Sequence, residues 1–421
     1  MATTMLTIER SEAREIEDQP GWILLYGRRK VGKTFMLRNF IHHDVFVSVR
    51  RDRISYATGL PVTRVTSPET LVDLTGPVLR RGGTVVVDEF QRLPGSFLDE
   101  VATFHPDGRL ILSGSSLAVV SRVLGVGSPM LGLTSVHHLR LVRPTDVLRS
   151  LLDRPPQTAL PFAAYLRDPW LVPKQEGRRS LEPFLLSVMG SARTTVPALI
   201  GEVFTESERY LSQVYEGVIR ALGARLWRPG DIAARLHESG LVSTGGSTQV
   251  TQYLANLMEM GIVDRVAVFG RSRPMAYRLA SNVMDTFYYL ADKHRIDEED
   301  RPAGDIRDNL QASVSRAMER FVGELFAQLM EGQVEYSFDP EVDFIITRGR
   351  RRKPVLAGEV RWGRFSAGDV RSFKAKVDDL ECRKVFIVPR ARTPEEVDGV
   401  EVLDARAVVD LALCHRPPSG E

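Results

Sequence analysis

Residues 27–34 read Gly27-Arg28-Arg29-Lys30-Val31-Gly32-Lys33-Thr34, which fits the pattern Gly-x-x-x-x-Gly-Lys-Ser/Thr. The apolar run at 22–26 before it predicts a buried strand, and apolar residues at helical spacing follow from 34 to 41. A glycine-rich loop that joins a strand to a helix is the setting in which this pattern binds phosphate. The sequence therefore predicts a phosphate-binding loop, with a chance glycine turn as the alternative.

The residue types of this loop follow from its chemistry. Glycines let the backbone fold around a phosphate, successive N–H groups point inward, and the helix N-terminus adds positive potential. Lys33 is predicted to pair with the β- and γ-phosphates, and the Thr34 hydroxyl to hold Mg²⁺. The predicted nucleotide-binding residues are Gly27, Arg28, Arg29, Lys30, Val31, Gly32, Lys33, Thr34 and Phe35.

A second apolar run, at 82–89, ends in two carboxylates, Asp88 and Glu89. Parallel sheets place ligands at the carboxyl ends of such strands, so Asp88 is predicted to hold a Mg²⁺-bound water and Glu89 to orient or deprotonate the attacking water. A solvated acidic turn is the alternative. A third strand, at 110–112, leads to Ser115 and Ser116, either of which could sense the γ-phosphate, and a serine that caps a helix is the alternative. Lys33, Asp88, Glu89 and Ser115 are the predicted catalytic residues.

Three segments together resemble a known family. They are 27–34, then Val87-Asp88-Glu89-Phe90-Gln91-Arg92-Leu93, then 112–116, and in this order they resemble the ATPase domain of the archaeal-type ATPases, P-loop proteins of the AAA+/STAND assemblage. The resemblance implies ATP and Mg²⁺ as cofactors and, in one branch, a C-terminal nuclease-like domain of the DUF234 type. The family tends to carry an arginine where this chain has Leu133, so intrinsic hydrolysis is expected to be slow. An arginine finger would come from Arg122, Arg140 or Arg143, or from a neighbouring subunit.

Composition excludes several classes of protein. A chain of 421 residues with 43% hydrophobic content has material for two to four domains. A net charge of +2 creates no overall attraction to nucleic acid or anionic membrane. No apolar run approaches the length of a membrane span, no signal-peptide core is seen, and two cysteines allow no disulfide framework. These features predict a soluble cytoplasmic protein without membrane partners.

The patterning predicts an α/β fold in four parts. Residues 1–150 alternate strands and helices, as a P-loop ATPase core with a parallel sheet does, with 139–141 as its last strand. Residues 151–224 are predicted to form a helical lid or linker that includes a proline-rich connector at 155–170. A winged helix is predicted at 225–294, and the resemblance implies a restriction-endonuclease-like α/β domain at 305–415.

The predicted winged helix could either bind DNA or serve as a packing module. Helices are expected from 229 and over 248–260, followed by a hairpin of 261–266 and 275–279. In DNA-binding winged helices the second helix enters the major groove and the wing contacts phosphate, but this helix lacks Lys and Arg, so packing against the ATPase core is the alternative. The candidate contacts to duplex DNA are Thr248, Gln249, Gln252, Arg271 and Arg273.

The C-terminal part, after a helix at 311–330, contains a second candidate site. Strands at 342–347 and 354–362 flank a basic turn, and a hairpin symmetric about Arg351 places Asp343 opposite Glu359, with Arg361 on the same face. Two carboxylates and a cation resemble the site of PD-(D/E)XK nucleases, which activate water with Mg²⁺. Asp343, Glu359 and Arg361 are the predicted nuclease residues.

This resemblance has two departures. Arg361 stands where a lysine is expected, and a guanidinium does not replace an ammonium at close quarters. Ala327 stands where the helix is expected to carry a glutamate, so Glu319 or Glu324 are alternatives, and Lys374 or Lys376 are alternative cations. An inactive relic or a nucleic-acid clamp therefore stays open beside an active nuclease. The basic turn, with Arg350, Arg351 and Arg352, is either solvated or contacts phosphate.

The sequence as a whole favours a Mg²⁺-dependent ATPase. ATP or ADP is predicted to control engagement of duplex DNA or of a protein partner, and a homo-oligomer is compatible with this. The alternatives are an ATP-regulated metal-dependent nuclease and a STAND-like signalling switch that does not bind DNA.

Overall fold

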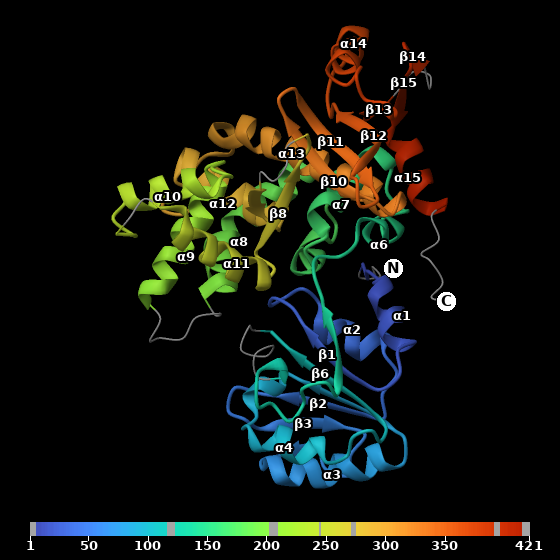
Figure 1. Cartoon of the computed structure of the whole chain (residues 1–421), viewed down its shortest axis with the longest axis vertical. Helices are drawn as coiled ribbons and strands as arrows, with labels where there is room; N and C mark the ends of the chain where they lie inside the picture. The colour runs from blue at the N-terminus through green and yellow to red at the C-terminus, as the bar shows by residue number, and fades with distance from the viewer. Residues whose placement is uncertain are drawn as a thin grey trace. The chain divides into compact units, whose positions relative to one another are not determined.

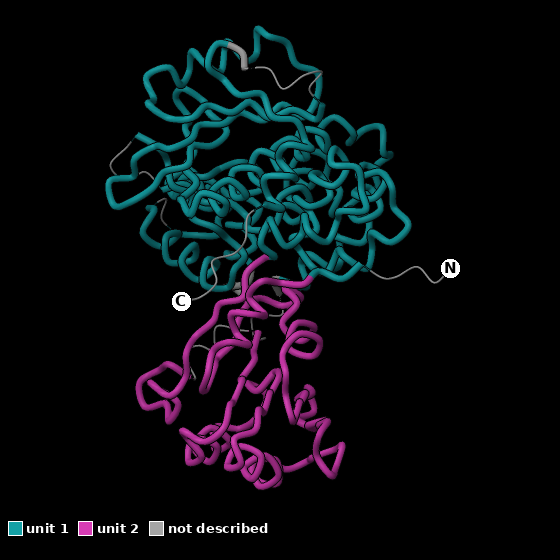
Figure 2. Tube along the Cα trace, turned by 90° about the vertical axis from the view of Figure 1, so that its right-hand side faces the viewer, with its two compact units in different colours: residues 1–8, 142–419, 421 teal, residues 9–141, 420 magenta. Residues whose placement is uncertain are grey.

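The computed structural model describes residues 6–115, 123–201, 209–243, 246–270, 275–390 and 396–414. The chain divides into two compact units, which Figure 2 shows in magenta for residues 9–141 and in teal for most of the remainder, from residue 142 on. The predicted parts 151–224, 225–294 and 305–415 fall within the second unit, and their bounds stay predictions. Among the helices that the structure describes, none is long and apolar enough to cross a membrane.

The first unit is built on a mixed sheet of seven strands. In spatial order these are β4 (Arg64–Val65), β3 (Ser55–Thr58), β2 (Val45–Val49), β5 (Thr84–Asp88), β6 (Arg109–Gly114), β1 (Trp22–Tyr26) and β7 (Thr134–His138). The five strands from β2 to β7 in this order are parallel, and β3 and β4 add an antiparallel edge. The predicted strand at 139–141 is wrong, because β7 ends at His138 and Leu139 follows it.

Helices cover both faces of this sheet (Figure 1). On β1, Ile23 and Leu25 share a buried cluster with residues of α1 (Ser11–Glu17) and α2 (Lys33–Phe40). Leu24 belongs to the opposite cluster, with residues of α3 (Pro68–Arg80) and α4 (Ser96–Ala102). A strand that buries both faces needs apolar residues throughout, which explains the unbroken runs in the sequence. The predicted α/β core is therefore confirmed at the level of its architecture.

The second unit begins with a region rich in helices. These are α6 (Pro144–Arg149), α7 (Pro156–Leu166), the 3₁₀ segment η2 (Pro169–Gln175), α8 (Leu181–Gly201), α9 (Arg209–Gly223), α10 (Pro229–Glu238), α11 (Ser247–Glu259), α12 (Asn282–His294) and α13 (Ala303–Leu329). The predicted connector at 155–170 is wrong, because α7 is a buried helix. Pro156 occupies its first turn, where a missing N–H costs no hydrogen bond, and Leu160 and Phe162 are fully buried.

A mixed sheet of eight strands completes this unit. Its spatial order is β14 (Glu396–Val397), β15 (Val400–Asp404), β13 (Arg383–Val388), β12 (Lys353–Val360), β11 (Glu341–Arg348), β10 (Gln333–Phe338), β8 (Val263–Val268) and β9 (Met275–Leu279), with α14 (Ala367–Lys376) and α15 (Ala405–Cys414) beside it. The predicted wing hairpin is β8 with β9, and its other edge pairs with β10, where Glu335 lies opposite Ala267. The predicted wing and the C-terminal strands therefore share one sheet.

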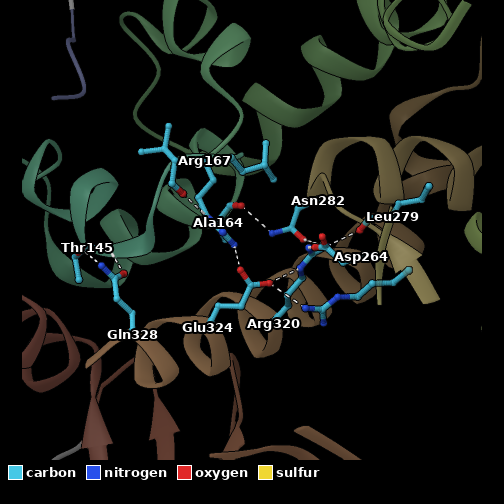
Figure 3. Close-up of polar contacts among 12 residues, drawn as sticks. Thr145, Ala164, Arg167, Asp264, Leu279, Asn282, Arg320, Glu324 and Gln328 are labelled. Atoms are coloured by element: carbon cyan, nitrogen blue, oxygen red, sulfur yellow. Dashed lines mark hydrogen bonds and ion pairs between the residues drawn. The ribbon is translucent and has the colours of Figure 1, made fainter. Parts of the chain in front are cut away.

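An ion cluster on α13 connects the elements of this unit (Figure 3). Glu324 accepts from Arg320 Nε and Arg278 Nη2, both at 2.9 Å, and also pairs with Arg167. Arg320 further donates to Asp264 at 2.7 Å and to the Leu279 carbonyl at 2.6 Å. Helix α13 is thereby tied to β8, to β9 and to the segment after α7.

The charge balance of this cluster depends on Glu324. Burial by itself would raise the pKa of Glu324, but the guanidinium groups of Arg167, Arg320 and Arg278 hold it well below the usual range. The Arg320 side chain is only 7% exposed, so the cluster has little access to water. Removal of the one carboxylate that three arginines share would leave their positive charges without compensation.

We expect Glu324→Gln to lower the free energy of unfolding by about 3 to 5 kcal/mol at neutral pH, which is the cost of breaking a buried ion pair. Because the pKa of Glu324 is lower in the folded state than its ordinary 4.5, this advantage of the wild type is complete above that pH and is lost as the pH falls further. Urea unfolding at neutral and acidic pH measures both effects. Glu298→Gln is the control, since it removes an exposed pair with Arg295 that is worth at most about 1 kcal/mol. Equal effects of the two substitutions would contradict the expectation.

Candidate functional site

The predicted phosphate-binding loop lies between β1 and α2. Gly32 adopts φ 96°, a left-handed backbone that favours glycine, directly before the first residue of α2. Gly27 is constrained differently, because a Cβ on it would lie 2.2 Å from the Leu139 carbonyl oxygen. The two glycines of the motif are therefore required by backbone conformation and by close packing respectively.

Lys33 is buried at the centre of this loop, with 5% of its surface exposed. Its Nζ donates to the carbonyl oxygens of Gly27 at 2.7 Å and of Arg28 at 3.0 Å. Burial lowers the pKa of Lys33 to about 8, although the carboxylates of Glu89 and Asp88 act in the opposite direction. A buried ammonium that is held mainly by carbonyl oxygens has a strong electrostatic preference for an anion.

Thr34 and Asp88, far apart in the sequence, meet beside Lys33. The Thr34 hydroxyl donates to Asp88 Oδ2 at 2.6 Å, and Asp88 is 1% exposed. Burial raises the pKa of Asp88, and the hydrogen bond from Thr34 opposes that rise. Within the described part of the chain, the buried Oδ1 of Asp88 accepts no hydrogen bond. A hydroxyl and a carboxylate with a free oxygen fit Mg²⁺, which prefers oxygen ligands.

Glu89 is held by its own neighbours. Its backbone is left-handed at φ 60°, directly after β5. Its Oε2 lies 3.0 Å from Arg92 Nη2, and accepts from Gln91 at 2.9 Å and from Ser115 at 3.3 Å. The sequence assigns no role to Gln91 or Arg92, and the only signal for them is that both lie within three residues of Glu89 in the segment 87–93. The candidate base is thus engaged by an arginine.

The remaining predicted loop residues differ in their exposure. Arg28 and Val31 are buried, Arg29 is half-buried and Lys30 is exposed. The Phe35 ring is 49% exposed and contacts the edge of Phe40. Phe35 is therefore accessible to a planar ligand group, which is compatible with its predicted place in the nucleotide site.

The candidate nucleic-acid contacts fall into three groups. Thr248, Gln249 and Gln252 are exposed on α11, and Arg350 and Arg351 are exposed at the β11–β12 turn. Arg271 and Arg273 lie outside the described residues. Arg352 differs from them, because its Nε donates to the buried Glu335 at 2.6 Å, which leaves fewer of its N–H groups for the predicted phosphate contact.

The predicted pairing of Asp343 with Glu359 is confirmed by the strand register. Phe344 pairs with Gly358, which sets Asp343 and Glu359 opposite each other, and a bulge nearer the turn leaves this end of the ladder unchanged. Asp343 accepts from the Val360 N–H at 2.7 Å. Glu359 Oε1 lies 3.2 Å from Arg361 Nη2 and 3.6 Å from Lys376 Nζ. Of the two alternative lysines, Lys376 is therefore the one that lies beside the acidic pair.

A third carboxylate, Glu319, belongs to the same surroundings. Burial raises the pKa of Asp343, and the charges of Glu319 and Glu359 raise it further. Burial also raises the pKa of Glu319, whereas Arg316 opposes the rise. The alternative Glu324 is wrong, because its carboxylate is bound by three arginines. Across the described ranges, no three His, Cys, Asp or Glu side chains are arranged to hold a metal ion.

The family match lies within the first unit, whereas the similar solved structures extend over 69–79% of the chain. Residues 19–130 match the model of an AAA domain, AAA_14. No curated protein matches the chain. Three similar solved structures have low identity and low TM-scores. Aeropyrum pernix ORC2 in its ADPNP-ADP complexes is 16% identical over 76% of this chain and 97% of that one, with a TM-score of 0.37. Aeropyrum pernix ORC1 in complex with DNA is 16% identical over 69% and 94%, with a TM-score of 0.26.

The third is a Pyrococcus horikoshii STAND protein with a tetratricopeptide repeat sensor, which is 12% identical over 79% of this chain and 57% of that one, with a TM-score of 0.26. TM-scores at this level do not establish a common fold over the aligned length. The assignment therefore rests on the family match together with the geometry of the loop and of Asp88. Residues 19–130 therefore match an AAA domain and contain a loop with the geometry expected of a phosphate-binding loop.

Proposed function

We propose that the chain binds ATP with Mg²⁺, hydrolyses it slowly, and uses its nucleotide state to control engagement of nucleic acid or of a protein partner. The observation that carries the proposal is the convergence of the buried Lys33 ammonium with the Thr34–Asp88 pair at the carboxyl ends of β1 and β5. The AAA domain match at 19–130 supports the same reading.

Each residue has a proposed part in binding. The backbone N–H groups between Gly27 and Thr34 bind the phosphates, and Lys33 neutralises their charge. Thr34 and Asp88 hold Mg²⁺, which would polarise the terminal phosphoryl group when bound. Glu89 orients and deprotonates the attacking water, and Ser115, which lies 3.3 Å from Glu89, senses the terminal phosphate.

The contact between Glu89 and Arg92 supports slow intrinsic turnover. A carboxylate that is held by a guanidinium is not free to approach and orient the attacking water. Arg92 is itself fixed by donation to the Val49 carbonyl at 2.6 Å. Hydrolysis therefore requires Glu89 to separate from Arg92, and a partner that promotes this separation would couple its own binding to turnover.

We expect Glu89→Gln to lower ATP turnover by about 100-fold or more, since it removes a general base, and to leave the ATP dissociation constant within about threefold. Lys33→Ala is expected to weaken ATP binding itself. Calorimetric titration with ATP and Mg²⁺, together with phosphate release, separates the two effects. Glu100→Gln serves as the matched control, because Glu100 lies on α4 and has no predicted part in the site. It is expected to leave the ATP dissociation constant and the rate of ATP turnover unchanged. Loss of ATP binding in Glu89→Gln, or full turnover in Lys33→Ala, would contradict the proposed site.

Duplex DNA is the first partner to test. We expect it to raise the turnover of the wild type several-fold at low salt, with the effect lost as salt rises, because phosphate contacts depend on counterion release. The stimulation is expected to fall in Arg350→Gln with Arg351→Gln, since both side chains are exposed. DNA binding without salt dependence would contradict the expectation that DNA is bound through its phosphates. Unchanged turnover with tight ATP binding would favour the alternative of a STAND-like switch that does not bind DNA.

A nuclease is the second candidate function, and one observation favours it. Asp343, Glu359 and Lys376 come from different elements and lie together, and the buried Oε2 of Glu359 accepts no hydrogen bond within the described ranges. Two carboxylates beside an ammonium are the groups that a metal-dependent phosphodiesterase needs. Arg361, paired with Glu359, is the feature that counts against activity.

If this site is active, Mg²⁺ or Mn²⁺ is expected to support cleavage of plasmid DNA that Glu359→Gln lowers by about 100-fold. Arg361→Lys is expected to raise the cleavage rate, because an ammonium takes the position of the guanidinium. The exposed Glu381→Gln is the control for a general effect of lost charge. Cleavage that survives Glu359→Gln would indicate a contaminant and remove this candidate.

A further inference from the structure

Two adjoining cavities of the second unit contain a cluster of arginines that the proposed function does not use. The larger has a volume of about 480 Å³ and the smaller about 130 Å³, and both are lined by Arg225, Trp227, Ala276 and Phe338. The volume of the larger is typical of sites for small molecules. The P-loop residues belong to the other unit, so these cavities form a separate site.

The smaller cavity is rich in arginine. Arg225, Arg278, Arg316 and Arg320 line it, together with two acidic residues, Asp285 and Glu319. Arg320 is engaged by Glu324 and Asp264, and Arg225 Nη1 by Asp285 at 2.6 Å. Burial raises the pKa of Glu319, which favours its neutral form and reduces the negative charge that it offers to the arginines.

Several guanidinium N–H groups of this cluster are buried without a hydrogen-bond partner. In the part of the chain that the structure describes, Nε and Nη2 of Arg225, Nε of Arg278 and Nη1 of Arg316 donate no hydrogen bond. Each unsatisfied buried donor costs about 1 to 3 kcal/mol, and more for a charged group. Four such donors on three arginines around one cavity are an arrangement that an anion would satisfy.

The backbone conformation of Arg225 is itself unfavourable for a residue other than glycine. Arg225 follows α9 with φ 72°, the left-handed conformation that helix ends usually give to glycine. The Arg225 guanidinium lies over the Tyr289 ring, 4.5 Å from its centroid, and the Arg316 guanidinium lies 5.4 Å from the centroid of the same ring. Strained residues that the surrounding structure maintains are concentrated at ligand sites.

The larger cavity offers an aromatic surface next to these donors. Trp227 and Phe338 stack with their centroids 5.3 Å apart and their planes at 30°, and Phe269 also lines the wall. Phe338 is 41% exposed, so the surface is accessible from solvent. A flat ring stacks favourably on such side chains and on arginine planes.

We propose that these cavities bind a small anionic ligand with a flat ring, of the nucleoside monophosphate class. Its phosphate binds Arg225, Arg278 and Arg316, and its ring lies against Trp227 and Phe338. The site is independent of ATP binding at the P-loop, so its failure would leave the proposed function intact.

Titration calorimetry with AMP on the full chain tests this proposal. Arg316→Gln is expected to weaken AMP binding by about tenfold, which corresponds to the loss of one charge-assisted hydrogen bond. Phe338→Ala, at an exposed position that does not endanger folding, is expected to weaken it by about threefold or more. Adenosine, which lacks the anion, and inorganic phosphate, which lacks the ring, are expected to bind at least about tenfold more weakly than AMP.

Two controls keep the outcomes distinct. Arg307→Gln, an exposed arginine on the same helix α13, is expected to leave AMP affinity unchanged. Lys33→Ala is also expected to leave it unchanged, because the P-loop is not the site. AMP binding that is lost in Lys33→Ala, that ignores both Arg316→Gln and Phe338→Ala, or that is absent at millimolar AMP would overturn the proposal.

Discussion

The first unit depends on one electrostatic constraint, which is the burial of the Lys33 ammonium beside two acidic residues. An isolated buried charge is costly in free energy. Here it is tolerated because the loop carbonyls of Gly27 and Arg28 accept hydrogen bonds from the ammonium and the carboxylates of Asp88 and Glu89 lie nearby. This arrangement needs β1 and β5 to end at the same edge of a parallel sheet, with β6 between them. The strand order β5, β6, β1 and the hydrogen bond from Thr34 to the buried Asp88 both meet that requirement.

The second unit relies on long-range contacts. Glu324 joins Arg167, Arg278 and Arg320, which come from three separate segments of the chain, and β8 joins the C-terminal strands through β10. A helical region, a hairpin and a C-terminal sheet therefore belong to one compact unit. The sequence suggests boundaries between these three parts, but residues on the two sides of each boundary remain in contact within the unit.

The features that could be predicted from the sequence are those that depend on a short stretch of it. The phosphate-binding loop, the strand ending at Asp88 and the register that faces Asp343 with Glu359 each follow from local spacing. Helix α7 was not predictable in this way, because its prolines argue against a helix and only its burial in the unit overrides them. The engagement of Glu89 by Arg92 depends on the left-handed backbone at Glu89, and the pairing of β8 with β10 joins strands that are distant in sequence. Neither has a signature in composition or periodicity.

The place of β8 between β9 and β10 has a practical consequence for dividing this protein into fragments. A cut in the charged segment before α13, which would look like a natural domain boundary, separates two hydrogen-bonded strands and leaves each with an unpaired edge. Exposed edges of this kind template association between chains. Fragments of the protein that begin or end in the segment before α13 would tend to aggregate. Fragments are better divided after residue 141, at the boundary between the two compact units.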